Sequence, residues 1–168
     1  FVAIDVEIAS RRPTAVCAIG AARYAGGIEV ASFASLVRFR GRPQYGRIHG
    51  LSRNELATAP EWPTVWRDLL ALLDGESRIV AYRAEFDRAA ILTMCGRYGP
   101  RPPPLKFICA AQIAKARTGR HVDLAGALVA LGIPFPGRAH DALSGARAAA
   151  AVVLACGGGP AEGGVPAM

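Results

Sequence analysis

The sequence lacks any apolar run of about 18 residues, the length that a membrane-spanning helix needs. No basic-then-apolar leader precedes the first apolar segment. With 168 residues, 52% of them hydrophobic, the chain is long enough for one ordinary domain with a buried core. We therefore expect a soluble, cytoplasmic domain over residues 1–156 with no membrane association. The Gly/Pro-rich stretch 157–168 predicts a disordered tail.

The sequence also lacks closely spaced cysteines and has very few lysines. The four cysteines are far apart and form no CxxC pair, which argues against both a zinc site and a disulfide framework. Arginine supplies nearly all of the positive charge, because the only lysines are Lys106 and Lys115. The net charge of +7 is compatible with a polyanionic partner. A coding bias towards arginine, alanine, glycine and proline would produce the same excess.

The first eight residues carry the most informative pattern. Their β-branched residues alternate and favour a strand: Val2, Ile4, Val6 and Ile8. A period of two then places Asp5 and Glu7 together on the opposite face. Two neighbouring buried carboxylates repel each other, and a cation between their oxygens would offset that repulsion. The alternative is an edge strand with a hydrated polar face, which the strongly apolar surroundings disfavour.

The rest of the chain predicts further strands and then helices. Strands over 15–24 and 28–39, joined at Gly26-Gly27, form an antiparallel ribbon with the first strand. Ser52 and Glu55 have the spacing of a capping box and begin a short helix. Short strands are expected over 78–82 and 106–109, and helices over 61–73, 84–98, 110–117, 122–131 and 141–155. This order predicts a mixed sheet covered by helices on both faces.

Three later stretches contain residues that suit a catalytic site, although each also has an ordinary explanation. Asp87 falls in the first turn of a helix, where the helix dipole favours an acidic residue. His140 precedes an alanine-rich helix and would serve equally as a loop residue or a cap. The segment 48–51, Ile-His-Gly-Leu, is either a plain turn or a loop that approaches a ligand.

Together these segments resemble the motifs of the DEDDh family of 3′→5′ exonucleases, which includes the proofreading epsilon subunit of bacterial DNA polymerase III and RNase T. Asp-Val-Glu at 5–7 is similar to the family's Asp-x-Glu, and Ile-His-Gly-Leu at 48–51 to its IHG loop. Residues 80–87, Val-Ala-Tyr-Arg-Ala-Glu-Phe-Asp, resemble VAHNxxFD, and 140–146, His-Asp-Ala-Leu-Ser-Gly-Ala, resemble HxALxDA. The resemblance extends in the right order from residue 1 to about residue 155.

The resemblance implies an α/β fold of the ribonuclease H-like type, a three-layer α/β/α sandwich with a mixed sheet of about five strands. It also implies hydrolysis of a terminal phosphodiester with two Mg²⁺ or Mn²⁺ ions. By this mapping Asp5 bridges both ions, Glu7 binds the ion on the nucleophile side, and Asp87 serves the other ion through water. His140 becomes the general base for the attacking water.

The implied partner is the 3′ end of single-stranded DNA or RNA, with a polymerase or another replication or repair protein as a second partner. Seven residues are expected to contact the substrate: Val6, Ile8, His49, Gly50, Leu51, Arg83 and Phe86. Tyr82 and Phe86 are candidates for stacking under the terminal base. Phe86, however, shares a helical stripe with Ala90 and Met94, which favours a place in the core.

The sequence departs from the family pattern at two positions. Gly145 stands where the family has its fourth metal-binding carboxylate, and Asp141, one helical turn earlier, is the nearest replacement. Arg83 stands where the family has asparagine, and it is able to pair with a carboxylate or a substrate phosphate. We therefore expect weakened metal binding. A working exonuclease, a degenerate module that binds nucleic acid or protein, and a scaffold without nucleic-acid binding remain as alternatives.

Overall fold

A mixed five-stranded sheet forms the centre of the computed structural model, which describes residues 1–12, 14–99 and 101–157. The strand order is β3-β2-β1-β4-β5. β1 pairs antiparallel with β2 and parallel with β4, so the direction of the strands changes at β1. The strand bounds are Val2–Ile8 (β1), Val16–Ala25 (β2), Ile28–Leu36 (β3), Arg78–Ala81 (β4) and Lys106–Cys109 (β5).

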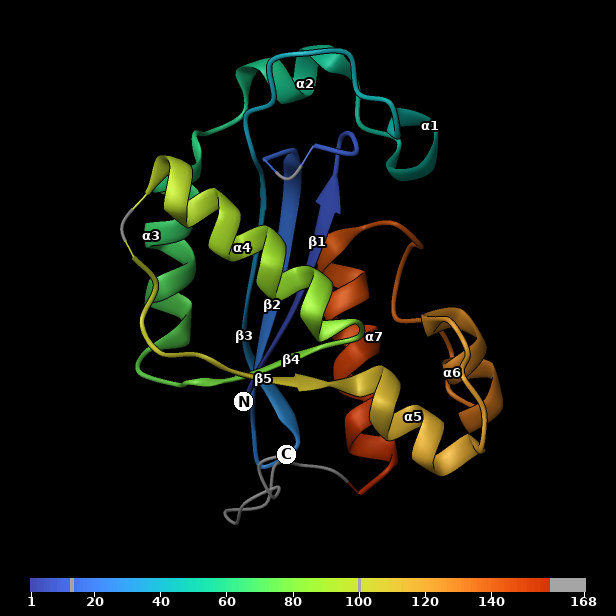
Figure 1. Ribbon diagram of the computed structural model, residues 1–168. Helices are drawn as coiled ribbons and strands as arrows, with labels where there is room; N and C mark the ends of the chain where they lie inside the picture. The colour runs from blue at the N-terminus through green and yellow to red at the C-terminus, as the bar shows by residue number, and fades with distance from the viewer. Residues whose placement is uncertain (13, 100, 158–168) are drawn as a thin grey trace.

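Helices cover both faces of this sheet (Figure 1). The helices α3 and α4 pack on one face, and α7 packs on the other with α5 and α6 outside it. Two short helices, α1 and α2, lie in the connection between β3 and α3. The helix bounds are Gly46–His49 (α1), Arg53–Thr58 (α2), Trp62–Leu73 (α3), Ala84–Tyr98 (α4), Ala110–Thr118 (α5), Leu124–Leu131 (α6) and Ala142–Ala155 (α7). The predicted three-layer α/β/α fold is confirmed.

The alternation in β1 divides the core as the sequence predicts. Val2, Ile4 and Val6 pack with α3 and α4, while Ala3 packs against α7. Asp5 and Glu7 share the face of Ala3 by the period of two, so both carboxylates face the α7 side of the sheet.

The helix α7 lies in direct contact with the backbone of the sheet. Gly20 of β2 pairs with Asp5 of β1, and a Cβ atom added at Gly20 would collide with backbone atoms of Ala142 and Leu143. Only a residue without a side chain permits this approach. The first turn of α7 is therefore held directly over the point where β1 carries Asp5.

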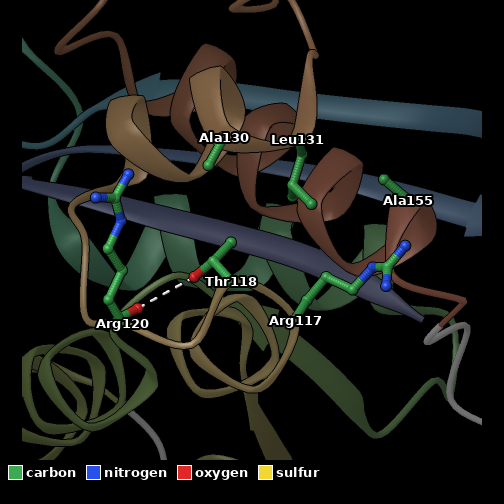
Figure 2. Close-up of a pocket in the computed structure, with 6 residues that line it drawn as sticks. All are labelled: Arg117, Thr118, Arg120, Ala130, Leu131 and Ala155. Atoms are coloured by element: carbon green, nitrogen blue, oxygen red, sulfur yellow. Dashed lines mark hydrogen bonds between the residues drawn. The ribbon is translucent and has the colours of Figure 1, made fainter.

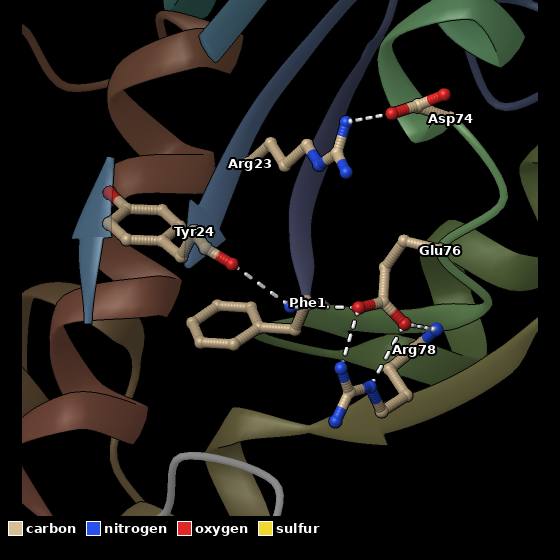
Figure 3. A network of polar contacts seen from close by, with 6 residues as sticks. All are labelled: Phe1, Arg23, Tyr24, Asp74, Glu76 and Arg78. Atoms are coloured by element: carbon tan, nitrogen blue, oxygen red, sulfur yellow. Dashed lines mark hydrogen bonds and ion pairs between the residues drawn. The ribbon is translucent and has the colours of Figure 1, made fainter. Parts of the chain in front are cut away.

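Polar contacts fix the opposite end of β1 (Figure 3). Arg23 of β2 pairs with Asp74 at the end of α3, with 2.8 Å between Nη1 and Oδ2. Glu76 pairs with Arg78 of β4 at 2.7 Å. The rings of Phe1 and Tyr24 stack beside them with centroids 5.2 Å apart. These contacts connect the α3–β4 loop to the N-terminal end of β1. The candidate site lies at the opposite, C-terminal end of this strand.

Two details differ from the sequence predictions. β3 ends at Leu36 and not at residue 39, and the helix α1 was expected to be a loop.

Other features of the chain agree with the predictions or lie beside them. The predicted capping box of Ser52 and Glu55 is present. Of the four free cysteines, two are buried and Cys109 and Cys156 are partly exposed. The predicted tail lies outside the described residues except for Gly157. No helix of the described residues is long and apolar enough to cross a membrane.

Candidate active site

A cleft of about 820 Å³ opens at the C-terminal end of β1. It is lined by most of the site residues expected from the sequence: Asp5, Val6, Glu7, Ile8, Arg83, Phe86, Asp87, His140 and Gly145. These residues come from β1, from the start of α4 and from the region around the start of α7. The fold thus brings together side chains that are up to 140 positions apart in the sequence.

Asp87 connects the first turn of α4 to β1. The amide N–H of Val6 donates a hydrogen bond to Asp87 Oδ1 at 3.2 Å, and the Asp87 side chain is only 3% exposed. Burial raises the pKa of Asp87 to about 7, although the Val6 hydrogen bond and the charge of Arg83 oppose the shift. Asp87 therefore does more than stabilise the start of α4 through the helix dipole. Its carboxylate also holds α4 against β1, the strand that carries Asp5 and Glu7.

Asp5 and Glu7 have raised pKa values for the same main reason. Burial is the largest cause for Asp5, followed by the nearby charges of Asp87, Glu7 and Asp141. Burial also raises the pKa of Glu7, while the charge of His140 lowers it. Three acidic groups therefore share a poorly hydrated space in which their charges repel each other.

His140 lies at the exposed rim of the cleft, in a loop with an unusual backbone conformation. Its φ of 60° is in the left-handed region, which residues other than glycine seldom occupy. The buried Ser144 hydroxyl holds this loop, because it accepts a hydrogen bond from the Arg138 N–H at 3.3 Å and donates one to Asp141 Oδ2 at 2.6 Å. The loop places the imidazole close enough to Glu7 to affect its pKa.

Gly145 faces Asp5 across the gap between α7 and β1. A Cβ atom added at Gly145 would collide with Asp5 Oδ2 and would lie 2.7 Å from Asp5 Cγ. A side chain at position 145 therefore requires the Asp5 carboxylate to move. Asp141 does not replace the missing carboxylate, because it is the N-cap of α7 and its Oδ2 accepts hydrogen bonds from the backbone and hydroxyl of Ser144.

The carboxylates suit a hard divalent cation by their chemistry. Asp5, Glu7 and Asp87 present only oxygen ligands, and their mutual repulsion is what a bound cation would relieve. Among the described residues, however, no group of three or more His, Cys, Asp or Glu side chains stands ready to hold one ion. By their chemistry these residues fit Mg²⁺ or Mn²⁺, with one carboxylate fewer than the family pattern.

The aromatic side chains of the cleft have different environments. Phe86 is 39% exposed in the cleft, so the expectation that it belongs to the core is wrong. The Arg83 guanidinium lies 5.7 Å from the centre of the Phe86 ring, and together they form one wall. The Tyr82 hydroxyl donates to the carbonyl oxygens of Val122 and Asp123, which fixes that ring at the cleft floor.

The IHG segment contributes a different residue from those expected. The His49 side chain is buried, with Nδ1 accepting a hydrogen bond from the Leu51 N–H at 3.1 Å. His49, Gly50 and Leu51 do not line the cleft, whereas Ile48, 52% exposed, does so together with Tyr45. A direct role of the His49 imidazole in substrate binding is therefore not compatible with this arrangement.

Sequence reasoning also missed the wall that the α5–α6 loop and α6 provide. Residues 121–125 line the cleft, as do Ala111, Phe135 and Ala139. Only the N-cap of α6, where Asp123 accepts a hydrogen bond from the Gly126 N–H, has a recognisable sequence signal. That signal marks the start of a helix and gives no indication of a cleft.

The mixed sheet covered by helices on both faces has the ribonuclease H-like fold. The chain matches the RNase T family model, described as an exonuclease, over residues 2–153 and therefore belongs to this exonuclease family. No curated protein matches the chain. Its structural neighbours include exonuclease X and a nuclease domain described as a DEDDh family member, the family that the sequence motifs predict.

Three solved structures illustrate the likeness. Exonuclease X in complex with 5′-overhanging duplex DNA has a TM-score of 0.71 and 22% identity, over 92% of this chain and 89% of that one. The nuclease domain of 3′hExo, a DEDDh member bound to rAMP, has a TM-score of 0.76 and 16% identity, over 91% and 88%. The zinc-bound complex of E. coli ExoI with single-stranded DNA has a TM-score of 0.72 and 16% identity, over 91% and 39%.

Proposed function

We propose that this protein is a 3′→5′ exonuclease that removes terminal nucleotides from single-stranded DNA or RNA, with an activity reduced by Gly145. The observation that carries the proposal is the convergence of Asp5, Glu7, Asp87 and His140 on one cleft. The exonuclease family match supports the reaction class. Similar folds are bound to DNA in exonuclease X and to rAMP in 3′hExo, which supports a nucleic-acid substrate.

We assign the residues roles that agree with the family resemblance and with their positions in the cleft. Asp5, Glu7 and Asp87 would hold Mg²⁺ or Mn²⁺, which supplies charge neutralisation at the phosphate and activation of water. His140 at the rim accepts the proton of the attacking water. Phe86 offers an exposed ring for the terminal base. Val6, Ile8 and Arg83 complete the proposed contacts, with Arg83 directed at phosphate.

Gly145 is the reason to expect reduced activity. Loss of a partner around a metal typically lowers affinity or activity by about 10–100-fold, and loss of a direct carboxylate ligand should have at least that effect. The same observation favours the second candidate function, a catalytically degenerate module that binds nucleic acid or a protein. In that case the cleft keeps Phe86 and Arg83 for binding, and the three carboxylates do not hold metal.

A nuclease assay separates the two candidates. The protein is incubated with a 3′-labelled single strand in Mg²⁺ or Mn²⁺, and we expect slow release of nucleoside 5′-monophosphates that Asp5→Asn abolishes. Gly145→Asp is compared with Gly145→Asn, because both side chains have the same shape and require the same movement of Asp5. We expect the aspartate to raise the rate at least about 10-fold over the asparagine variant.

The outcomes are distinct. A parent protein that binds the strand without cutting it, combined with cutting by Gly145→Asp, supports the degenerate module. A parent protein as fast as Gly145→Asp would contradict the proposed impairment. Cutting that survives Asp5→Asn would contradict the assignment of the cleft as the active site.

A partnership with a polymerase or another replication or repair protein rests on the family resemblance alone and stays a proposal. The cytoplasmic location also stays a proposal, and the four free cysteines are consistent with a reducing compartment.

A further inference from the structure

Six arginines lie in α1, in the segments on either side of it and in the β1–β2 turn beside it, and we call them the basic shelf; Ile48 of α1 lines the cleft. Two lie in the β1–β2 turn, two follow β3, one is in α1 and one begins α2: Arg11, Arg12, Arg40, Arg42, Arg47 and Arg53. All six are exposed. Within the described part of the chain, none of them forms an ion pair with a carboxylate, whereas Arg23, Arg38 and Arg147 do.

The basic shelf also lacks acidic neighbours in the sequence. Between Glu7 and Glu55 the only acidic residue is Glu29, and its carboxylate is held by Arg147 of α7 at 2.6 Å. A coding bias explains why this chain has many arginines. It does not explain why six exposed ones occupy a segment that is almost free of aspartate and glutamate.

The shelf is continuous with the cleft. Arg11 Nε donates a hydrogen bond to the hydroxyl of Tyr45 at 3.3 Å, and Tyr45 lines the cleft beside Ile48. The N–H groups of Gln44 and Tyr45 both donate to the carbonyl of Ala9, at 2.7 and 3.2 Å. These bonds join the β1–β2 turn to the start of α1, so the arginines of both segments lie on parts of the chain that are attached to the Tyr45 side of the cleft.

We propose that the basic shelf binds the phosphodiester backbone of a single strand outside the cleft, upstream of the nucleotides that the cleft receives. Exposed guanidinium groups without carboxylate partners are suited to phosphate oxygens. The proposal rests on the proposed function for the placement of the 3′ end, but the shelf binds phosphates whether or not the strand is cut. It predicts that the bound strand extends beyond the cleft and contacts the shelf through its phosphates.

A second basic feature provides a matched comparison. Arg117 and Arg120 border a cavity of about 520 Å³ between α5, α6 and the end of α7, where Thr118 Oγ1 donates to the carbonyl of Arg120 (Figure 2). Leu131 and Ala155 form the apolar part of its wall. This cavity has two arginines where the shelf has six, so we assign the strand to the shelf.

The test measures binding of a labelled single strand of about 20 nucleotides, longer than one nucleotide-binding surface, as DNA and as RNA. Fluorescence anisotropy is recorded in EDTA at several salt concentrations, so that no cutting occurs. Arg42→Gln/Arg47→Gln is compared with Arg117→Gln/Arg120→Gln, which removes the same charge from the other basic feature. Neither Arg42 nor Arg47 makes a side-chain hydrogen bond in the described residues, and thermal unfolding verifies that both variants fold.

We expect the shelf variant to bind about 10-fold more weakly at low salt. The slope of log K against log salt should fall by about 1.4, since each phosphate contact to a single strand contributes about 0.7. The Arg117/Arg120 variant should keep the affinity and slope of the parent. Unchanged binding by the shelf variant overturns the proposal, as does an equal loss in the comparison variant or an absence of binding by the parent.

The nuclease assay keeps this proposal separate from the proposed function. If the protein never cuts but its affinity depends on the shelf, the shelf proposal holds and the proposed exonuclease function is wrong. If Arg42→Gln/Arg47→Gln binds and cuts the strand as the parent does, the shelf proposal is wrong and the proposed exonuclease function holds.

Discussion

The Asp87 carboxyl connects the stability of the protein to pH through one buried group. Its pKa is raised from 3.8 to about 7, so the folded protein binds a proton that the unfolded chain has lost between these values. The stability that this proton gives is fully present below about pH 4, decreases as the pH rises, and is lost above about pH 7. One such proton allows a slope of at most about 1.4 kcal/mol per pH unit.

Replacing Asp87 by asparagine should therefore stabilise the protein at high pH. In Asp87→Asn the amide oxygen can still accept the hydrogen bond from the Val6 N–H, and no charge is buried. We expect the variant to exceed the parent in free energy of unfolding at pH 8, with a difference that shrinks towards pH 5. Urea unfolding across this range measures it, and Asp68→Asn on the exposed side of α3 is the control. Parallel pH profiles of Asp87→Asn and the parent would contradict this account.

At the scale of residues, the sequence predicted those positions whose chemistry and periodicity agree. Asp5 and Glu7 were placed on one face because a strand alternates, and β1 has that alternation. His49 was misjudged because adjacent residues of a short helix point in different directions, and the imidazole turned inward to the Leu51 N–H. No local pattern distinguishes these two orientations of a histidine.

At the scale of elements, the contact between α7 and the sheet determines the geometry of the site. Gly20 lets the backbone of α7 approach β2, and Gly145 lets the same helix approach Asp5. The sequence predicted both elements from their periodicity. It did not predict their close approach, because an isolated glycine in a strand or a helix indicates only that a side chain is absent.

Alanine at position 20 should be strongly destabilising. Its methyl group would meet backbone atoms of Ala142 and Leu143, which cannot rotate away as a side chain can. We expect Gly20→Ala to lower the free energy of unfolding by on the order of 1–3 kcal/mol or more. The control is Gly96→Ala in α4, where a Cβ atom has open space and alanine favours the helix by up to about 1 kcal/mol. Chemical denaturation of both variants measures the difference, and equal stabilities would show that α7 adjusts freely.

At the scale of the whole molecule, the topology accounts for what the sequence could and could not predict. The order of strands and helices led to the mixed sheet with helices on both faces, because each element had a clear period and turn signals. The cleft wall formed by residues 121–125 could not be predicted, because it arises where the α5–α6 loop packs over Tyr82. Such a contact depends on the assembled layers and has no local signal.

Metal binding in the cleft should depend on folding, because the three carboxylates come from β1 and α4 and meet only in the folded protein. Asp5, Glu7 and Asp87 repel each other when ionised, so a divalent cation that binds only the folded protein should raise its melting temperature. At about 100 times the Kd the gain is about 2.7 kcal/mol. For a domain of this size that corresponds to about 5–10 °C.

We expect Mn²⁺ to produce this shift at pH 8 and a smaller one at pH 6. The pKa values of the three carboxyl groups are raised, so at pH 6 more of them are protonated and protons compete with the metal. Differential scanning fluorimetry with and without EDTA measures it. Asp5→Asn should remove the shift, while Asp68→Asn, which changes an exposed carboxylate on α3, should keep it. A melting temperature of the parent that is unaffected by millimolar Mn²⁺ and Mg²⁺ at pH 8 would exclude the cleft as a metal site. Nucleic-acid binding would then be the function that its remaining residues support.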